Sequence, residues 1–162
     1  MIPLIVIMGF YEKIIEFLNS KNVNYQLFEH EPVFTSKQAS EVRGGGVIEQ
    51  GAKALVFDIG RPVMLVLRGN DKVDGKLAKS ILQVKQVPLA TPENVKKYTG
   101  VEIGAVAPFG FLLGIETFVD EKLLNNEHIL FNPGKHNKTI KMLALDYKKI
   151  GEIKLKNFSK ND

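Results

Sequence analysis

Apolar residues recur along the chain with a helical period in some blocks and with alternation in others. Thr35, Asp74 and Thr91 each stand directly before a helical block, as N-cap residues do. Thr35 also starts a capping-box pattern, the glycines at 44–46 are expected to end that helix, and Gly100 is expected to end another. The predicted helices cover residues 11–22, 35–42, 75–82 and 92–99, with a short helical turn at 146–150.

Short β-prone runs separate these helices. Two of them, at 52–57 and 62–68, are joined by Asp58-Ile-Gly60, which predicts a central hairpin. Residues 101–114 contain three glycines, a proline and two phenylalanines, a composition typical of a structured loop. The predicted strands cover residues 25–29, 52–57, 62–68, 115–120, 129–132, 139–143 and 152–155. With no internal repeat and no linker, the pattern predicts one mixed α/β (α+β) domain.

The first eight residues, MIPLIVIM, are all apolar, but the run is much shorter than the roughly 18 to 20 residues of a membrane span. It also lacks the basic start and the cleavage site of a secretory signal. A buried first strand or a simple extension is therefore expected, in a cytoplasmic protein without membrane contact. The expected organisation is an apolar N-terminal segment over 1–10, one domain over 11–157 and a polar tail over 158–162.

The composition excludes several classes of chemistry. The chain has 162 residues, of which 44% are hydrophobic and 25% charged, as in an ordinary compact domain. Without cysteine it has no disulfide, thiolate nucleophile or cysteine-based zinc site. Its three histidines are His30, His128 and His136, and no two have the i, i+4 spacing of a helical metal site. We therefore expect neither a metal nor an organic cofactor.

The net charge of +4 is unevenly distributed. Residues 135–162 contain eight lysines and three acidic residues, a net charge of +5, whereas residues 1–134 carry a net charge of −1. This segregation is typical of a surface that faces a polyanion, and a lysine-rich end that only aids solubility is the alternative. The lysines considered as nucleic-acid contacts are Lys135, Lys138, Lys141, Lys148 and Lys149.

Three places in the sequence could carry chemistry. Lys53 lies within the apolar run 51–57, where alternation places it in or beside a covered face, unless its ammonium reaches solvent from the start of the strand. In 104–110, glycines flank Pro108, so backbone amides could approach a ligand, although such residues more commonly form turns. The corner at 30–35 by itself predicts only a capped turn.

Taken together and in order, these segments resemble the YbaK/prolyl-tRNA-synthetase-associated domain family, the free-standing relatives of the editing domain inserted in bacterial prolyl-tRNA synthetases. Asp120 and Gly134 fit the later part of the family pattern. The segments that carry the resemblance are YQLFEHEPVFT at 25–35, GAKALVF at 51–57, LRGND at 67–71 followed by Val73-Asp74 and Lys76-Leu77, and TGVEIGAVAPFG at 99–110.

The resemblance implies a strongly curved mixed β-sheet, or partial barrel, surrounded by helices, with a pocket beside the lysine-bearing strand. It also implies trans-acting hydrolysis of the ester that joins a wrong amino acid to the 3′ end of a tRNA. The implied catalytic residues are Lys53 and Gly104. The implied substrate-binding residues are His30, Phe34, Thr35, Ala105, Val106, Pro108, Phe109, Gly110, Asn132, Gly134 and His136.

The chemistry agrees with this assignment. Because an aminoacyl ester is already activated, an enzyme needs to position it and stabilise the developing oxyanion rather than supply a covalent nucleophile. A lysine is a cation at neutral pH, so Lys53 is better suited to stabilising charge or clamping substrate than to acting as a general base. Amides at 104–106 could bind the ester carbonyl or the ribose, and the substrate's vicinal hydroxyl is a candidate for the missing acid/base group.

Some positions differ from the better-defined branches of the family. Ala54 follows Lys53 where asparagine or threonine marks the alanine- or cysteine-editing branches, and Asn132 stands where an alanine-editing relative tends to have histidine. The expected pocket walls are Phe34, Phe57, Ala105 and Phe109, which favour a small side chain such as that of alanine, cysteine, serine or threonine.

Besides deacylation, two other functions remain open from the sequence. The domain is either a deacylase, a non-catalytic module that binds tRNA or a synthetase, or a small-molecule-binding domain unrelated to RNA. The expected partners are the acceptor end of an aminoacyl-tRNA, of tRNA-Pro or a similar tRNA, and a prolyl-tRNA synthetase. A monomer or a homodimer is expected.

Overall fold

The computed structural model describes residues 8–42 and 48–161, so the expectations for residues 1–7 and for the glycines at 44–46 lie outside it. Each predicted helix is confirmed, with ends within two residues of those expected. The helices are α1 (Phe10–Ser20), α2 (Ser36–Val42), α3 (Gly75–Leu82), α4 (Pro92–Thr99) and α5 (Ala144–Ile150), with 3₁₀ turns η1 (Ile48–Gln50), η2 (Gly110–Leu113) and η3 (Leu123–Asn125). Within the described ranges, no helix is long and apolar enough to cross a membrane.

Local capping chemistry explains why α3 and α4 begin where they do. The Asp74 carboxylate accepts hydrogen bonds from the amides of Lys76 and Leu77, at 3.0 and 3.3 Å. The Thr91 hydroxyl accepts one from the amide of Asn94 at 3.1 Å, and α4 ends at Gly100 in the left-handed conformation, with φ +78°. These interactions satisfy amides at the helix start and let the chain turn at the helix end.

The mixed α/β class is confirmed, with the described strands divided among three sheets. The first is antiparallel, with β1 (Tyr25–Glu29), β7 (Lys138–Leu143) and β6 (His128–Phe131) in that order. The second contains β2 (Ala52–Asp58), β3 (Pro62–Arg68), β5 (Glu116–Asp120) and β8 (Lys154–Lys156), and the third contains β4 (Asp71–Val73) and β9 (Ser159–Asn161). A parallel bridge from Gly51 to Leu130 joins the start of β2 to β6.

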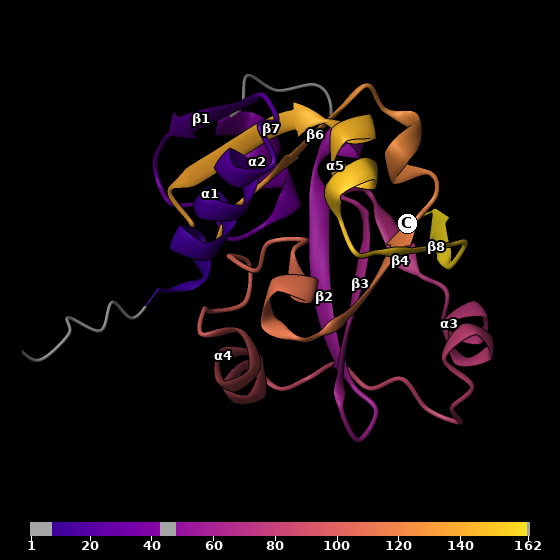
Figure 1. The fold of residues 1–162 in the computed structure, drawn as a ribbon. Coiled ribbons are helices and arrows are strands. Elements are labelled where there is room, and N and C mark those ends of the chain that lie inside the picture. Colours follow the sequence, from indigo (N-terminus) through magenta and orange to yellow (C-terminus); the bar gives the residue numbers. More distant parts are fainter. Residues whose placement is uncertain (1–7, 43–47, 162) are drawn as a thin grey trace, which may run out of the picture.

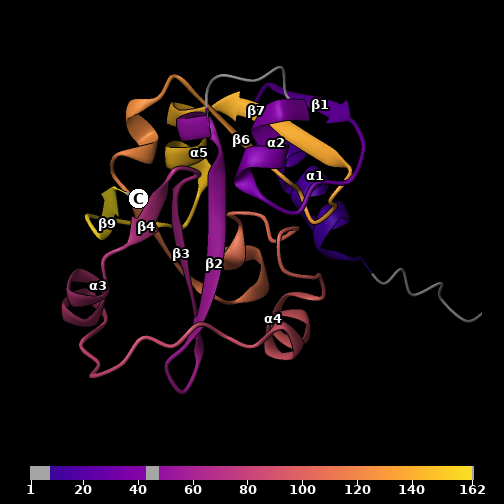
Figure 2. The same cartoon turned by 180° about the vertical axis from the view of Figure 1, so that it is seen from behind.

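The β2–β3 hairpin is the centre of the fold (Figure 1). It runs between α4 on one side and α3 on the other, and the view from behind shows the same arrangement (Figure 2). The middle of β3 is buried on both faces, which explains its continuous apolar sequence. Met64 and Val66 face the larger core, with α1 and α5, whereas Val63, Leu65 and Leu67 face a smaller one beneath α3.

Residues 158–161, which were expected to belong to a polar tail, pack into the fold. Phe158 is fully buried in the smaller core, and Ser159–Asn161 pair with β4 in antiparallel register. The buried Asp120 carboxylate accepts hydrogen bonds from the amides of Phe158 and Ser159, both at 2.9 Å. This docking was not predictable from local sequence, because the pairing partner β4 lies far away in the chain.

An ion-pair cluster at the end of the second sheet is expected to make the stability of the fold depend on pH. Glu116 on β5 bonds to Lys154 at 2.7 Å and to Arg61 at 3.2 Å, which lowers the pKa of its carboxyl, chiefly through the Lys154 hydrogen bond. A lowered folded-state pKa stabilises the fold above the ordinary pKa of a glutamate, and this stabilisation is lost as the pH falls through the folded value. We expect Glu116→Gln to cost up to about 1 kcal/mol at pH 7. In urea titrations the difference should shrink as the pH falls below the ordinary pKa of a glutamate and through the lowered folded value, and a constant difference would contradict this assignment.

Candidate functional site

A cavity of about 480 Å³ opens along the outer edge of β2. At its start β2 is bridged to Leu130, and at its end Phe57 forms an antiparallel bridge with Leu89. Between these two bridges, residues 52–56 form one wall of the cavity, which faces α2, the segment 103–106 and Asn132. The volume lies in the range of small-molecule sites.

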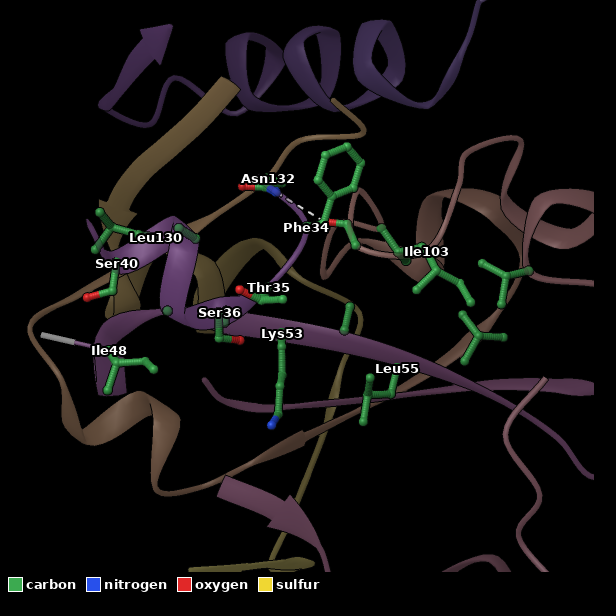
Figure 3. Close-up of a pocket in the computed structure, with 18 of the residues that line it drawn as sticks. Phe34, Thr35, Ser36, Ser40, Ile48, Lys53, Leu55, Ile103, Leu130 and Asn132 are labelled. Carbon is green, nitrogen blue, oxygen red and sulfur yellow. Dashed lines mark hydrogen bonds between the residues drawn. The ribbon is translucent and has the colours of Figure 1, made fainter. Parts of the chain in front are cut away.

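The cavity brings together part of the expected site. It is lined by seven of the residues singled out from the sequence, namely Phe34, Thr35, Lys53, Gly104, Val106, Asn132 and Lys141. Figure 3 shows that they come from separate segments: Phe34 and Thr35 precede α2, Lys53 lies on β2, and Asn132 follows β6. Packing of distant segments thus makes the site.

Lys53 borders the cavity, but its charge is held by the main chain. Its Nζ donates to the carbonyl oxygens of Asp71 and, at 3.5 Å, Gly69. In Figure 3 the side chain extends from β2 on the side away from Asn132. Lys53 therefore neither extends freely into solvent nor points at Asn132; its half-buried ammonium is fixed beside the turn between β3 and β4.

The carbonyl acceptors of Lys53 are themselves fixed. The Asp71 carboxylate is almost completely buried and forms a two-point contact with Arg68, with Nε–Oδ2 at 2.7 Å and Nη2–Oδ1 at 3.2 Å. Asp71 also pairs with Asn161 through β4 and β9. Such bidentate pairs are geometrically specific, so they define the position of the carbonyl that holds Lys53.

Gly104 lies in a crowded corner opposite β2. It has φ +89°, and a Cβ built on it would lie 3.2 Å from Cε1 of His136 and 3.3 Å from the carbonyl oxygen of Phe34. Its own carbonyl accepts a hydrogen bond from Nδ2 of Asn132 at 3.0 Å. The glycine thus allows the 103–106 segment to approach the 132–136 loop closely.

His136 supports this corner from behind the cavity. Its ring packs on Phe34 with centroids 4.4 Å apart, and Nδ1 lies 3.0 Å from the carbonyl oxygen of Val33. Because a carbonyl can only accept, Nδ1 is the donor in this contact. Nε2 is buried, and within the described residues it has no hydrogen-bond partner.

The exposed apolar side chains at the mouth of the cavity are unusual for a monomer surface. Phe34 is 60% exposed, Leu89 62% and Ile103 51%, and all three line the cavity. Clustered exposed apolar side chains around a hollow are typical of a binding site. The Phe34 amide donates to the Gln38 side chain at 2.9 Å, while the Thr35 hydroxyl accepts from the Gln38 amide at 3.1 Å, so the cap of α2 fixes this rim.

Ala105, Pro108 and Phe109 of the 104–110 loop have structural roles. Ala105 and Phe109 are buried, and Phe109 packs in an aromatic cluster with Phe131 and Tyr147. The buried carbonyl of Pro108 accepts a hydrogen bond from the Tyr147 hydroxyl at 2.5 Å, and burial raises the pKa of that hydroxyl. These residues hold the wall formed by Gly104 and Val106 but do not themselves line the cavity.

Other expected contacts also lie outside the cavity lining. Phe57 is on the opposite face of β2, in the smaller core, because it is separated from Ala52, Ala54 and Val56 by the strand alternation. Gly110 packs against Thr117 and Met64, and Gly134 packs against Tyr11. Nδ1 of His30 donates to the Glu31 carbonyl and Nε2 accepts from the Thr139 hydroxyl, both at 2.7 Å, so this histidine connects β1 to β7.

The expected tRNA-binding lysines fall into separate groups. Lys141 lines the cavity. Lys135 and Lys138 lie over the ring of Tyr11, at 5.9 and 5.7 Å from its centroid, and Lys138 also bonds to Glu29 at 2.5 Å, which lowers the pKa of that carboxyl. Lys148 and Lys149 are exposed in the last turn of α5.

The two serine side chains that line the cavity were not predicted from the sequence. Ser36 and Ser40 line it from α2, together with Ile48 and Gln50 from η1. Ser36 and Ser40 are four residues apart, so the expected helix places both serines on one face, but no local sequence feature shows that this face meets β2. Across 8–42 and 48–161, no three metal-ligating side chains gather in a group that could hold a metal ion.

The fold and the cavity define a small mixed α/β domain with a ligand-sized site at a free strand edge. Residues 30–150 match the family model of the aminoacyl-tRNA editing domain. The protein belongs to this family, as the sequence resemblance predicted.

Two curated relatives and one solved structure extend the comparison. The chain is 29% identical over 154 residues to the multifunctional Ser/Thr-tRNA deacylase ProXp-y of Escherichia coli K12, covering 91% of this chain and 92% of that protein. It is 26% identical over 145 residues to the prolyl-tRNA editing protein ProX of Acetoanaerobium sticklandii, covering 86% and 88%. The crystal structure of the hypothetical protein APE2540 has the same fold, with a TM-score of 0.83, 21% identity and coverage of 92% and 100%.

Proposed function

We propose that the protein is a trans-acting deacylase, which hydrolyses the ester bond of mischarged aminoacyl-tRNA. The observation that carries this proposal is the cavity at the edge of β2, which lies within the range that matches the editing domain and is bordered by Lys53, Gly104 and Asn132. Its volume of about 480 Å³ is suitable for a terminal nucleoside with a small amino acid.

The chemistry needs positioning and charge stabilisation rather than a covalent nucleophile. Lys53 supplies the positive charge at the cavity wall, either to the oxyanion that develops on the ester or to a neighbouring phosphate. Gly104 lets its loop approach the ester closely, and the exposed ring of Phe34 offers a surface for the terminal base. A water molecule attacks the ester carbon, with the vicinal ribose hydroxyl as the acid/base group that transfers its proton. The bond from the ester carbon to the ribose oxygen breaks, and that oxygen leaves with a proton, which releases the amino acid and the uncharged tRNA.

The amino acid removed is small. The residues that line the cavity on the Ala54 side of β2 include Ala52, Val56, Val95 and Val106, all with short side chains. Alanine, cysteine, serine and threonine are the candidates, carried on tRNA-Pro or a similar tRNA, and the relatives are described as acting on Ser/Thr-tRNA and in prolyl-tRNA editing. A prolyl-tRNA synthetase is the proposed source of the mischarged substrate.

The test of this function is a deacylation panel. tRNAs charged with alanine, cysteine, serine, threonine and their correct amino acids are incubated with protein or with buffer, and the surviving ester is measured over time. At least one mischarged tRNA should lose its ester faster with protein. The proposal is contradicted if the protein does not accelerate ester hydrolysis for any tRNA in the panel. Binding of tRNA without faster hydrolysis would instead indicate a non-catalytic tRNA-binding module.

The proposed tRNA-binding lysines predict how the affinity for tRNA depends on salt concentration. If Lys135, Lys141 and their neighbours bind phosphates, log Kd should rise by about 0.7 to 0.9 per log unit of salt for each contact. Removing one lysine, as in Lys141→Ala, should lower that slope by about one contact. Fluorescence anisotropy with labelled tRNA at several salt concentrations measures it. A slope that stays the same in the variant would show that this lysine does not contact phosphate.

A further inference from the structure

β2 is the outer strand of its sheet, so its main-chain groups point alternately toward β3 and away from it. The carbonyl of Gly51 accepts from the Gly69 amide at 2.7 Å, on the β3 side. On the outer side, the Val56 carbonyl accepts from the Ala90 amide and the Asp58 amide donates to the Pro88 carbonyl, both at 2.9 Å. The even-numbered residues of β2 therefore direct their N–H and C=O groups outward.

Ala54 lies midway between the two contacts that close this edge. Before it, Gly51 is bridged to Leu130, and after it, Val56 bonds to Ala90. By the same alternation, the N–H and C=O of Ala54 point outward, and residues 52–56 form the cavity wall at this point. An exposed strand edge of this kind is a template for another extended group.

We infer that the main chain of Ala54 is the clamp for the aminoacyl group of the substrate, an inference that rests on the proposed function. An α-aminoacyl ester carries an N–H donor and a C=O acceptor on either side of one Cα atom, as one residue of a β-strand does. Two residues that face each other in a hydrogen-bonded antiparallel pair exchange both N–H···O bonds. The α-ammonium of the substrate donates to the Ala54 C=O, and the ester carbonyl oxygen accepts from the Ala54 N–H.

This pairing links chemistry to selectivity. The Ala54 N–H remains hydrogen-bonded to the carbonyl oxygen of the ester while negative charge develops on that oxygen. A backbone donor in an oxyanion hole accelerates acyl transfer in this way. Directly paired residues carry their side chains on the same face of a sheet. The side chain of an L-amino acid therefore lies beside the Ala54 methyl, against Val95 and Val106, whereas that of a D-amino acid points to the Lys53 side. The clamp recognises the main-chain groups of any α-amino acid, and the wall limits the size of the amino acid side chain.

The test removes the Ala54 N–H alone, by replacing Ala54 with lactic acid through nonsense suppression so that an ester oxygen stands in place of the nitrogen. We expect kcat on the most reactive mischarged tRNA to fall about 100-fold while the melting temperature changes little. Ala54→Pro also removes the donor, and proline is tolerated at an outward-facing position of an edge strand. Ala54→Val adds comparable bulk to the wall and keeps the N–H, so the further loss in Ala54→Pro beyond that in Ala54→Val measures the contribution of the donor.

A second measurement separates this inference from the proposed function. The probe is seryl-adenosine with a 3′-amide link, which cannot be hydrolysed, and the readout is the NMR shift of the Ala54 amide proton. A downfield shift on binding supports the clamp even if no tRNA in the panel is hydrolysed. The inference is overturned if the lactic acid variant hydrolyses at the wild-type rate, or if the probe binds without moving that amide signal.

Discussion

Lys53→Ala is expected to lower the rate of deacylation by at least about 100-fold, the size of effect seen when one preorganised charge or donor is removed from an acyl-transfer site. The ammonium is held by the carbonyls of Gly69 and Asp71 on a carbonyl-lined turn that Arg68 fixes. The oxyanion that develops on the ester, or a neighbouring phosphate, is the negatively charged partner that this ammonium stabilises, and the methyl group of the Lys53→Ala variant cannot replace it. Single-turnover hydrolysis of the most reactive mischarged tRNA measures the effect.

The control for this variant is Lys154→Ala, which removes the same charge from β8, where the lysine bonds to Glu116 and lies over the Phe118 ring. It should retain the wild-type rate. Lys53→Arg keeps the charge but changes the geometry of the donor, so an intermediate rate is expected. If Lys53→Ala hydrolyses as fast as wild type, Lys53 has no catalytic role and only secures the turn between β3 and β4.

Gly104→Ala is expected to lower the rate by about 10- to 100-fold, because small displacements of a positioned group are costly in catalysis. The new methyl group would lie 3.2 Å from the His136 ring and 3.3 Å from the Phe34 carbonyl, and the backbone there has φ +89°. Either the 103–106 segment moves away from Asn132, or the Phe34 rim moves outward. Both changes widen the cavity, so kcat should fall more than binding of the tRNA body.

Gly100→Ala is a matched control for the backbone strain. Gly100 also has a positive φ, +78°, but nothing lies within 4 Å of a Cβ built on it. Both variants should lose about 1 to 2 kcal/mol of stability from left-handed alanine, measured by urea unfolding, yet only Gly104→Ala should lose activity. Equal losses of activity would show that strain alone, and not the closeness of Gly104 to His136, explains the effect.

Local chemistry made much of the fold predictable from the sequence. The caps at Asp74 and Thr91 and the β2–β3 hairpin are encoded within a few residues of where they occur, so spacing and residue type were sufficient. The ribbon of β4 with β9 was missed because its two strands are short and far apart in sequence, and the burial of Phe158 shows only once they pair.

The site was predictable only where a motif carried it. Lys53, Gly104 and Asn132 were named through the family resemblance, and the structure brings them to one cavity. Phe57 and Phe109 were expected in its walls, but strand alternation and core packing direct them into the two cores. The Ala54 main chain had no sequence signal, because an outward N–H depends on which edge of β2 is paired.

The central claim is that a bound aminoacyl-tRNA is hydrolysed in the cavity at the edge of β2. The most direct test mixes excess protein with a mischarged tRNA and follows, in the same sample, the fraction of tRNA bound and the fraction of ester remaining. Ester loss should follow binding with a first-order rate well above that in buffer, and Lys53→Ala should bind the tRNA yet leave the ester intact. Full binding of every mischarged tRNA in the panel with an unchanged ester half-life would contradict the claim.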